Sequence, residues 1–182
     1  QVKGVIFTHL QEMIESQQGF QVWDAILEHC DLPSGGVFVS TERYPDDELF
    51  AIVTELSAVT NTAINDLLGS FGEYLFVNLH KSMPPEVFAP LTLWDLLKGL
   101  DSIIHMEVKK LDKKAQPPTL TVKRSSDHEM VLEYRSTKKL CYLAMGMLKS
   151  AANMFAEEVT LAMPVCIHDG HDYCELVITR HV

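Results

Sequence analysis

Residues 120–134 read LTVKRSSDHEMVLEY, and this stretch decides the fold class. Apolar residues alternate with polar ones on both sides of Ser125-Ser126-Asp127, which predicts two strands joined by a hairpin. A second pair of strands is predicted at 159–167 and 174–182, with Asp169-Gly170 in the turn. A helical pattern over 140–155 separates the two pairs. The order strand–strand–helix–strand–strand is typical of an antiparallel sheet covered by helices.

The part of the chain before this hairpin has helical periodicity. Apolar spacing and turn residues predict helices over 5–14, 22–29, 49–59, 64–79 and 93–111. We expect Gly19 to end the first helix and Asn61 to cap the helix that begins at residue 64. Pro117-Pro118 is expected to close the last one. The predicted fold class is therefore α+β, with the helices first and the sheet second.

Composition and charge exclude several classes of protein. The 182 residues are 47% hydrophobic and 22% charged, as in an average globular domain, so we expect a single domain. The net charge of −10 opposes binding to nucleic acid and to an anionic membrane surface. The chain contains no apolar run long enough to span a bilayer and no export signal at its start. We therefore expect a cytoplasmic protein with reduced thiols.

His105 lies beside the apolar stripe of the predicted helix 93–111. A histidine in this place can be a core residue bonded to a carbonyl group. It can also be a ligand, because an imidazole on a rigid helix is the commonest proximal ligand of haem iron.

Tyr134, Ser136 and Lys138 follow one another at strand spacing, where a strand gives way to a helix. Side chains at this spacing point to the same face, and two hydroxyls with a cation would bind a pair of carboxylates or a phosphate. The alternative is a strand end whose hydroxyls cap the next helix.

Three of the four cysteines lie in the last 42 residues. Cys166 and Cys174 flank a tight turn that contains His168 and His171, and Cys141 opens the preceding helix. Thiolates and imidazoles are the ligands that zinc prefers, so this group is a candidate zinc site. Separate thiols or a redox pair remain the alternatives.

These elements together resemble the haem nitric-oxide/oxygen binding (H-NOX) domain, which also forms the haem domain of soluble guanylate cyclase. The resemblance covers essentially the whole chain. It rests on Lys3-Gly4-Val5-Ile6, Gly19-Phe20-Gln21-Val22-Trp23, Phe71-Gly72-Glu73-Tyr74-Leu75-Phe76, Ile104-His105-Met106-Glu107-Val108, Pro117-Pro118, Tyr134-x-Ser136 and Gly146. It implies one domain, 1–182, with a helical subdomain at about 1–65, an α/β subdomain at about 66–182, and haem b between them.

The resemblance also implies roles for single residues. His105 matches the proximal ligand of the haem iron, and Pro118 matches a proline that presses on the haem. Tyr134 and Ser136 match two positions of a Tyr-x-Ser-x-Arg motif that holds the haem propionates, and the third position is Lys138. Lysine keeps the positive charge but lacks the planar guanidinium group of arginine, which can bind a carboxylate through two hydrogen bonds.

Some bacterial members hold zinc with three cysteines and a histidine, which Cys141, Cys166 and Cys174 match in part. Met163 stands where the histidine is expected, so His168 or His171 would have to replace it, or the site is incomplete.

Five positions are expected by resemblance to line the distal side of the haem, and all are apolar: Ile6, Leu10, Leu75, Leu143 and Met147. Oxygen-binding members have a tyrosine where this chain has Leu143. Since bound oxygen needs a hydrogen-bond donor and nitric oxide does not, we predict a nitric oxide sensor that excludes oxygen.

We predict no enzyme activity, because paired carboxylates and activated nucleophiles do not stand out. Release of His105 is expected to pass the signal to a separate histidine kinase or cyclic-di-GMP enzyme, since no output domain follows Val182. The alternative is a zinc-stabilised cysteine redox switch in which haem is secondary.

Overall fold

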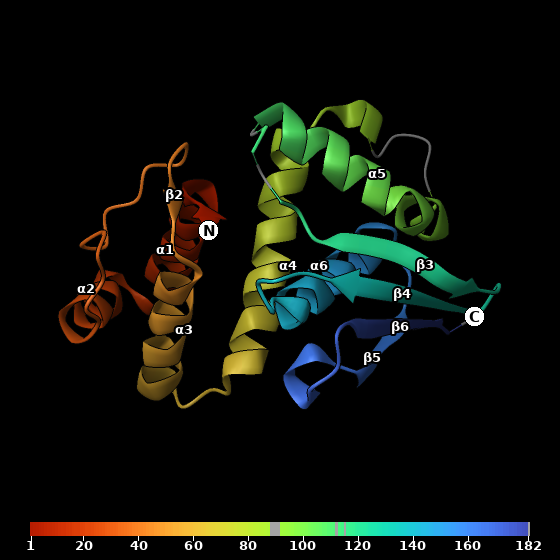
Figure 1. Cartoon of the computed structure of the whole chain (residues 1–182). Helices are drawn as coiled ribbons and strands as arrows, with labels where there is room; N and C mark the ends of the chain where they lie inside the picture. Colours follow the sequence, from red (N-terminus) through yellow and green to blue (C-terminus); the bar gives the residue numbers. More distant parts are fainter. Residues whose placement is uncertain (88–91, 112, 115, 182) are drawn as a thin grey trace.

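A computed structural model describes residues 1–87, 92–111, 113–114 and 116–181. It consists of a group of N-terminal helices, a long central helix and a four-stranded sheet with further helices (Figure 1). The molecule is α+β with antiparallel sheets, as the alternating and helical patterns predict.

The N-terminal part contains helices α1 (Gly4–Gln18), α2 (Phe20–His29) and α3 (Asp46–Thr60). Gly19 separates the first two with a φ of 94°, a conformation that L side chains rarely adopt, which explains the break. Two very short strands, β1 (Val2–Lys3) and β2 (Arg43–Tyr44), pair antiparallel beside α1. The sequence patterns did not predict this pair, because two residues are too few to show alternation.

Helix α4 (Ile64–Ser82) stands between the N-terminal helices and the sheet, and its main packing partner is α6 (Cys141–Met154) (Figure 1). Glycines allow the two backbones to touch. A Cβ atom on Gly146 would lie 1.9 Å from the carbonyl oxygen of Gly69, and one on Gly72 would lie 2.1 Å from that of Leu143. The close packing of α4 on α6 therefore depends on glycine, which has no side chain, at positions 72 and 146.

The sheet has the order β3–β4–β6–β5 and is antiparallel throughout. Its strands are β3 (Thr119–Ser125), β4 (Glu129–Arg135), β5 (Val159–Val165) and β6 (Cys174–Arg180). Helix α5 (Leu93–Leu111) packs against β3. Two short 3₁₀ turns, at Pro85–Val87 and Ile167–Asp169, complete the described elements.

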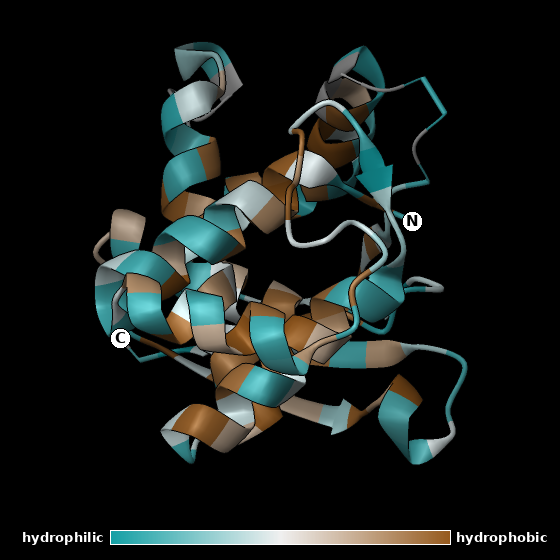
Figure 2. Ribbon diagram, turned by 90° about the vertical axis from the view of Figure 1, so that its left-hand side faces the viewer, coloured by the Kyte–Doolittle hydropathy of each residue, from teal (hydrophilic) through white to brown (hydrophobic). Residues whose placement is uncertain are grey.

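The buried side chains form two clusters. One joins α1, α2, α3 and α4 and includes Leu143 of α6, and the other joins α5, the sheet and the rest of α6. On the N-terminal helices, hydrophilic residues face outward and hydrophobic ones turn toward the middle of the molecule (Figure 2). Helix α6 thus contributes to both clusters.

Two local predictions are wrong. Asn61 does not cap the start of α4; it ends α3 in the left-handed conformation, with a φ of 52°, which asparagine tolerates better than most residues. The strand spacing of Tyr134, Ser136 and Lys138 also fails, because β4 ends at Arg135. The Ser136 hydroxyl then accepts a hydrogen bond from the Lys138 backbone N at 3.1 Å, which turns the chain away from the sheet.

Candidate functional site

His105 lies on α5, two turns before the end of the helix, and its side chain is 41% exposed. His105 therefore lies at the boundary between the core and the surface. Its Nε2 atom lies 3.6 Å from Oδ1 of Asp101, which is one turn earlier on the same helix. Residues Ile103 and Ile104 pack into the cluster below α5 and fix the rotation of the helix. The imidazole is thus accessible from outside the core and held on a rigid element.

Tyr134 is the most deeply buried polar side chain of the predicted propionate motif, with 2% exposure. Burial raises the pKa of Tyr134 to about 12, against smaller opposing effects of hydrogen bonds to the Ser136 side chain and the Leu140 backbone. The phenol therefore stays neutral and can donate a hydrogen bond at physiological pH. Ser136 and Lys138 are both half-buried, and the hydrogen bond from the Lys138 backbone N to the Ser136 hydroxyl links them at this turn.

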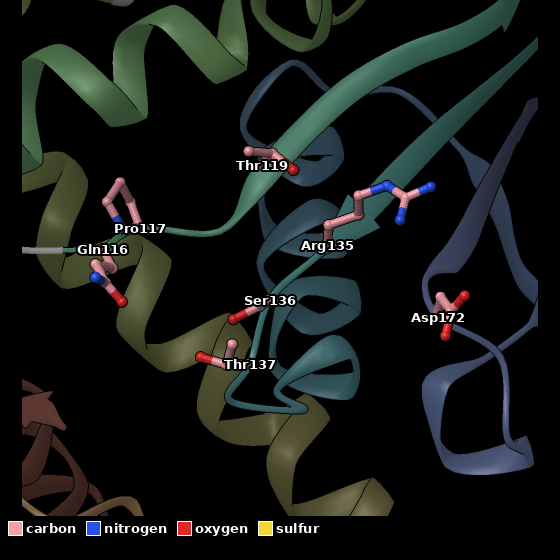
Figure 3. A pocket seen from close by; sticks show the side chains of 7 residues that line it. All are labelled: Gln116, Pro117, Thr119, Arg135, Ser136, Thr137 and Asp172. Atoms are coloured by element: carbon pink, nitrogen blue, oxygen red, sulfur yellow. The ribbon is translucent and has the colours of Figure 1, made fainter.

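Ser136 also lines an open cavity of about 440 Å³ between the start of β3 and the end of β4 (Figure 3). Ser136 and Thr137 project to one side of the segment after β4, and Arg135 projects to the other. The lining residues are Gln116, Pro117, Thr119, Arg135, Ser136, Thr137 and Asp172. Pro118, which was singled out in the sequence, is half-buried and follows directly on Pro117.

The predicted distal positions come together in the N-terminal cluster. Leu10 of α1, Leu75 of α4 and Leu143 of α6 are buried, with at most 7% exposure. Ile6 and Met147 are partly buried and pack against the same cluster. All five side chains, from three helices, thus belong to this cluster and offer only hydrocarbon and thioether surface. His105, in contrast, belongs to the helix that packs on the other cluster.

Three thiols meet where α6 begins beside the β5–β6 turn. The Sγ atom of Cys166 lies 3.8 Å from that of Cys141 and 3.9 Å from that of Cys174, and all three residues are buried. The ligand atoms of Cys141, Cys166 and His168 all lie within 4.8 Å of one another. Burial raises the pKa of the Cys141 and Cys174 thiols, and the neighbouring cysteines raise that of Cys141 further. This group has the donor set of a zinc site.

The sequence analysis missed Asp101 and most of the residues that line the cavity. Asp101 lies four residues before His105, which is the spacing of neighbours on a helix face and could have drawn attention to it. Gln116, Thr119 and Asp172 carry no local signal, because only the pairing of β3, β4 and β6 brings their segments together.

A family model described as "Haem-NO-binding" matches residues 3–163. The chain belongs to this family. A search of curated protein sequences gives no match. The match extends over α1 to α6 and most of β5, so His105, the turn at Ser136 and the five apolar positions all lie inside it.

Solved H-NOX structures are similar to the chain over its full length. An H-NOX protein from S. oneidensis in the Fe(II)NO ligation state is 32% identical, with a TM-score of 0.89 and 100% of both chains covered. The Fe(II) unliganded H-NOX protein from K. algicida is 25% identical, with a TM-score of 0.91 and coverage of 100% of this chain and 97% of that one. The IWP-051-bound H-NOX from Shewanella woodyi in the Fe(II)CO ligation state is 34% identical, with a TM-score of 0.82 and coverage of 99% and 95%.

The fold of the chain is thus the H-NOX fold, and the resemblance seen in the sequence is confirmed. H-NOX domains serve as sensors of gases. Within the described part of the chain, each helix is too short or too polar to cross a lipid bilayer.

Proposed function

We propose that this H-NOX domain is a haem-based sensor that binds nitric oxide at ferrous haem and excludes oxygen. The proposal rests on five apolar side chains of α1, α4 and α6 that belong to one cluster. Haem would supply an iron ion that binds the gas. The protein residues would hold the haem, choose the ligand and respond to it.

The residues of this chain fit haem b. His105 offers an imidazole that is 41% exposed on a helix, so a metal ion can reach it. Tyr134 offers a neutral hydroxyl, and Ser136 and Lys138 offer a second hydroxyl and a cation at the same turn. Propionates are carboxylates, for which such a donor set is suited. Lys138 would contribute a point charge in place of the bidentate contact of an arginine.

The gas preference follows from the apolar cluster. Oxygen on ferrous haem gains partial negative charge and is held by a hydrogen-bond donor, whereas nitric oxide binds without one. Leu143 stands at the position of the tyrosine found in oxygen-binding members and is 7% exposed. The methyl groups of Leu143 cannot donate a hydrogen bond. Binding of oxygen would therefore be weaker relative to binding of nitric oxide.

The response would begin at His105. His105 would hold the haem iron, and its release when nitric oxide binds would free α5. The helical part at about residues 1–65 would then move relative to the α/β part, since the two rest on separate clusters. We propose that a histidine kinase or a cyclic-di-GMP enzyme, as a separate cytoplasmic protein, reads this movement, and we assign no catalytic step to this chain.

The test is the visible spectrum of the anaerobically reduced protein before and after addition of nitric oxide, and then in air. We expect a haem absorption band that shifts to that of a five-coordinate nitrosyl, with no stable complex in air. His105→Gly should lose the band or need added imidazole to restore it. Absence of the band in wild type after reconstitution would refute haem binding, and a stable complex with oxygen would refute the proposed gas preference.

The cysteine group favours a second function, a zinc-stabilised redox switch. Cys141, Cys166 and His168, with Cys174 beside Cys166, would hold zinc. An external peroxide that oxidises two of the thiolates to a disulfide, and is itself reduced to water, would release the zinc and loosen the β5–β6 turn. Zinc content measured after dialysis against a chelator and addition of one equivalent of Zn²⁺ tests the site. We expect about one zinc per chain, lost in Cys166→Ser and retained in Cys30→Ser, because Cys30 lies beside Ala51 and away from the group. No zinc in wild type would remove this function.

A further inference from the structure

The two edges of the four-stranded sheet are protected to different extents. At the β3 edge, α5 packs against the strand, and Oδ1 of Asp101 accepts a hydrogen bond from the backbone N of Leu120 at 2.9 Å. Lys123 and Arg124 place charges on β3, and a register shift interrupts its pairing with β4. Covering elements, charges and bulges are the features that prevent an edge strand from pairing with another chain.

The β5 edge carries fewer of these features. Among the described residues, no strand pairs with the outer side of β5, which lies at the lower edge of the sheet in Figure 1. Residues 159–167 contain no charged side chain. Pro164 lies at the register shift between Ala162 and Val165, so it interrupts pairing only toward the end of the strand. The first half of β5 is thus an open and uncharged edge.

The backbone groups on this open edge can be assigned from the pairing with β6. The backbone N of His181 donates a hydrogen bond to the carbonyl oxygen of Glu158 at 3.1 Å, so the backbone of Glu158 faces β6. The direction of these groups alternates along an antiparallel strand. The backbone of Thr160 therefore also faces β6, whereas the N–H and C=O groups of Val159 and Leu161 face outward.

The side chains around these outward groups suit a second copy of the same strand. Val159 and Leu161 are half-buried and Val159 packs against the cluster beneath the sheet, whereas Thr160 is exposed. With a two-fold axis at Thr160, Val159 of one copy lies opposite Leu161 of the other, and each such pair exchanges both backbone hydrogen bonds. The two threonines then lie opposite each other, a cross-strand pair that stabilises sheets.

The charges of the chain favour the antiparallel arrangement. The net charge of −10 makes two copies repel each other, so they can approach only where the surface is uncharged. With the axis at Thr160, the acidic residues Glu157 and Glu158 lie opposite Met163 and Ala162 of the second copy, which are uncharged. A parallel arrangement would instead bring the acidic residues of the two copies together, which destabilises a strand pair.

We infer that β5 is a self-association surface, at which two copies of this chain pair antiparallel and form one continuous sheet. The same surface of each copy makes the contact, as a two-fold dimer requires. Because the paired segment is short, the dimer is weak and forms at high protein concentration. The inference does not depend on haem, since none of the paired residues is among those that we assign to haem.

The test is sedimentation velocity of the full chain under reducing conditions, from micromolar to millimolar concentration. We expect the mass of wild type to rise from 20.5 kDa toward twice this value. Thr160→Lys and Thr160→Glu each place like charges opposite each other at the axis, so each should raise the dissociation constant about tenfold or more. An equimolar mixture of the two variants should form dimers again, because a lysine then lies opposite a glutamate.

Two further variants separate pairing from damage to the fold. Thr121→Lys places the same charge on an exposed position of β3 and should leave the dissociation constant unchanged. Ala162→Lys should lower the dissociation constant, because its lysine would lie opposite Glu158 of the second copy. All these positions are exposed, so the melting temperatures should agree with that of wild type, apart from a small loss at Thr160, whose hydroxyl contacts His181.

The outcomes that would overturn the inference are distinct from one another. A wild-type chain that stays monomeric up to millimolar concentration would show that β5 does not pair. Opposite effects of Thr160→Lys and Thr160→Glu would show that net charge, and not the pairing of residue 160 with itself, governs association. A mixture of these two variants that stays monomeric would exclude the proposed axis, and loss of the dimer in Thr121→Lys would place the contact on another part of the sheet.

Discussion

At the scale of single residues, the proposed gas preference depends on Leu143. We predict that Leu143→Tyr gives the ferrous protein a measurable oxygen complex, because the tyrosine hydroxyl would donate a hydrogen bond. One such bond contributes about 0.5–1.5 kcal/mol, or roughly a two- to tenfold gain in oxygen affinity. The measurement is the absorption spectrum of the reduced protein equilibrated with air.

Leu143→Phe is the matched control for this prediction. Phenylalanine adds similar bulk to the N-terminal cluster, and so a similar overpacking cost of about 1–3 kcal/mol, without a hydroxyl. Equal oxygen binding by the two variants would mean that space, and not hydrogen bonding, governs the selection.

Tyr134 makes the stability of the fold depend on pH above neutrality. Burial raises its pKa to about 12 in the folded protein, whereas an unfolded chain leaves it near its ordinary value of 10. The folded state therefore holds the phenolic proton more tightly. Its contribution to stability is complete below pH 10 and is lost as the pH rises through 12.

We predict that the free energy of unfolding of wild type falls between pH 10 and 12 by about 2–3 kcal/mol more than that of Tyr134→Phe. Phenylalanine has no proton to lose, so comparison of the variants cancels the other groups that titrate in this range. Urea unfolding of the metal-free, haem-free protein at several pH values measures the difference. Parallel curves would show that Tyr134 titrates normally in the folded chain.

At the scale of elements, the contact of α4 with α6 depends on backbone atoms. Gly146 faces the carbonyl oxygen of Gly69, and a Cβ atom would lie 1.9 Å from it. We predict that Gly146→Ala lowers the free energy of unfolding by about 1–3 kcal/mol or more, because the helices must separate to admit the methyl group. Urea denaturation measures this loss.

Gly69→Ala provides the opposite expectation on the partner helix. A Cβ atom at Gly69 meets nothing within 4 Å, so alanine should stabilise α4 by about 0.5–1 kcal/mol through its better helix propensity. Equal destabilisation by both substitutions would mean that these glycines do not act by allowing the close contact of the two backbones.

At the scale of the whole molecule, the two clusters predict where movement occurs. The helices α1, α2 and α3 rest on one cluster, and the sheet rests on the other. We predict that nitric oxide accelerates amide hydrogen exchange in α5 and in the contact of α1 with α4, relative to the carbon monoxide complex. The central strands β4 and β6 should exchange at the same slow rate in both complexes, because each is paired on both sides.

Hydrogen exchange resolved by mass spectrometry of peptides tests this pattern. A uniform change over all peptides would indicate global loosening. Faster exchange confined to α5 would show that release of His105 is not passed to the N-terminal helices.

Local sequence patterns were enough to predict the long helices, the four-stranded sheet and the family. The alternation over 120–134 and the helical stripe over 93–111 are local properties, and they predicted the β3–β4 hairpin and α5 to within a residue or so. Local rules failed where a neighbour decided the conformation. Asn61 suits both ends of a helix, and only the packing of α3 against α4 put it at the end of α3.

The side chains that come close to one another are set by the packing of segments far apart in the chain. Sequence spacing suggested that Tyr134, Ser136 and Lys138 share a face, but the strand ends at Arg135 and the turn at Ser136 redirects Lys138. The approach of Asp101 to Leu120 spans 19 positions of the chain and depends on how α5 packs on the sheet. Local patterns reflect interactions between near neighbours in the chain, whereas a binding site depends on distances between segments that packing alone sets.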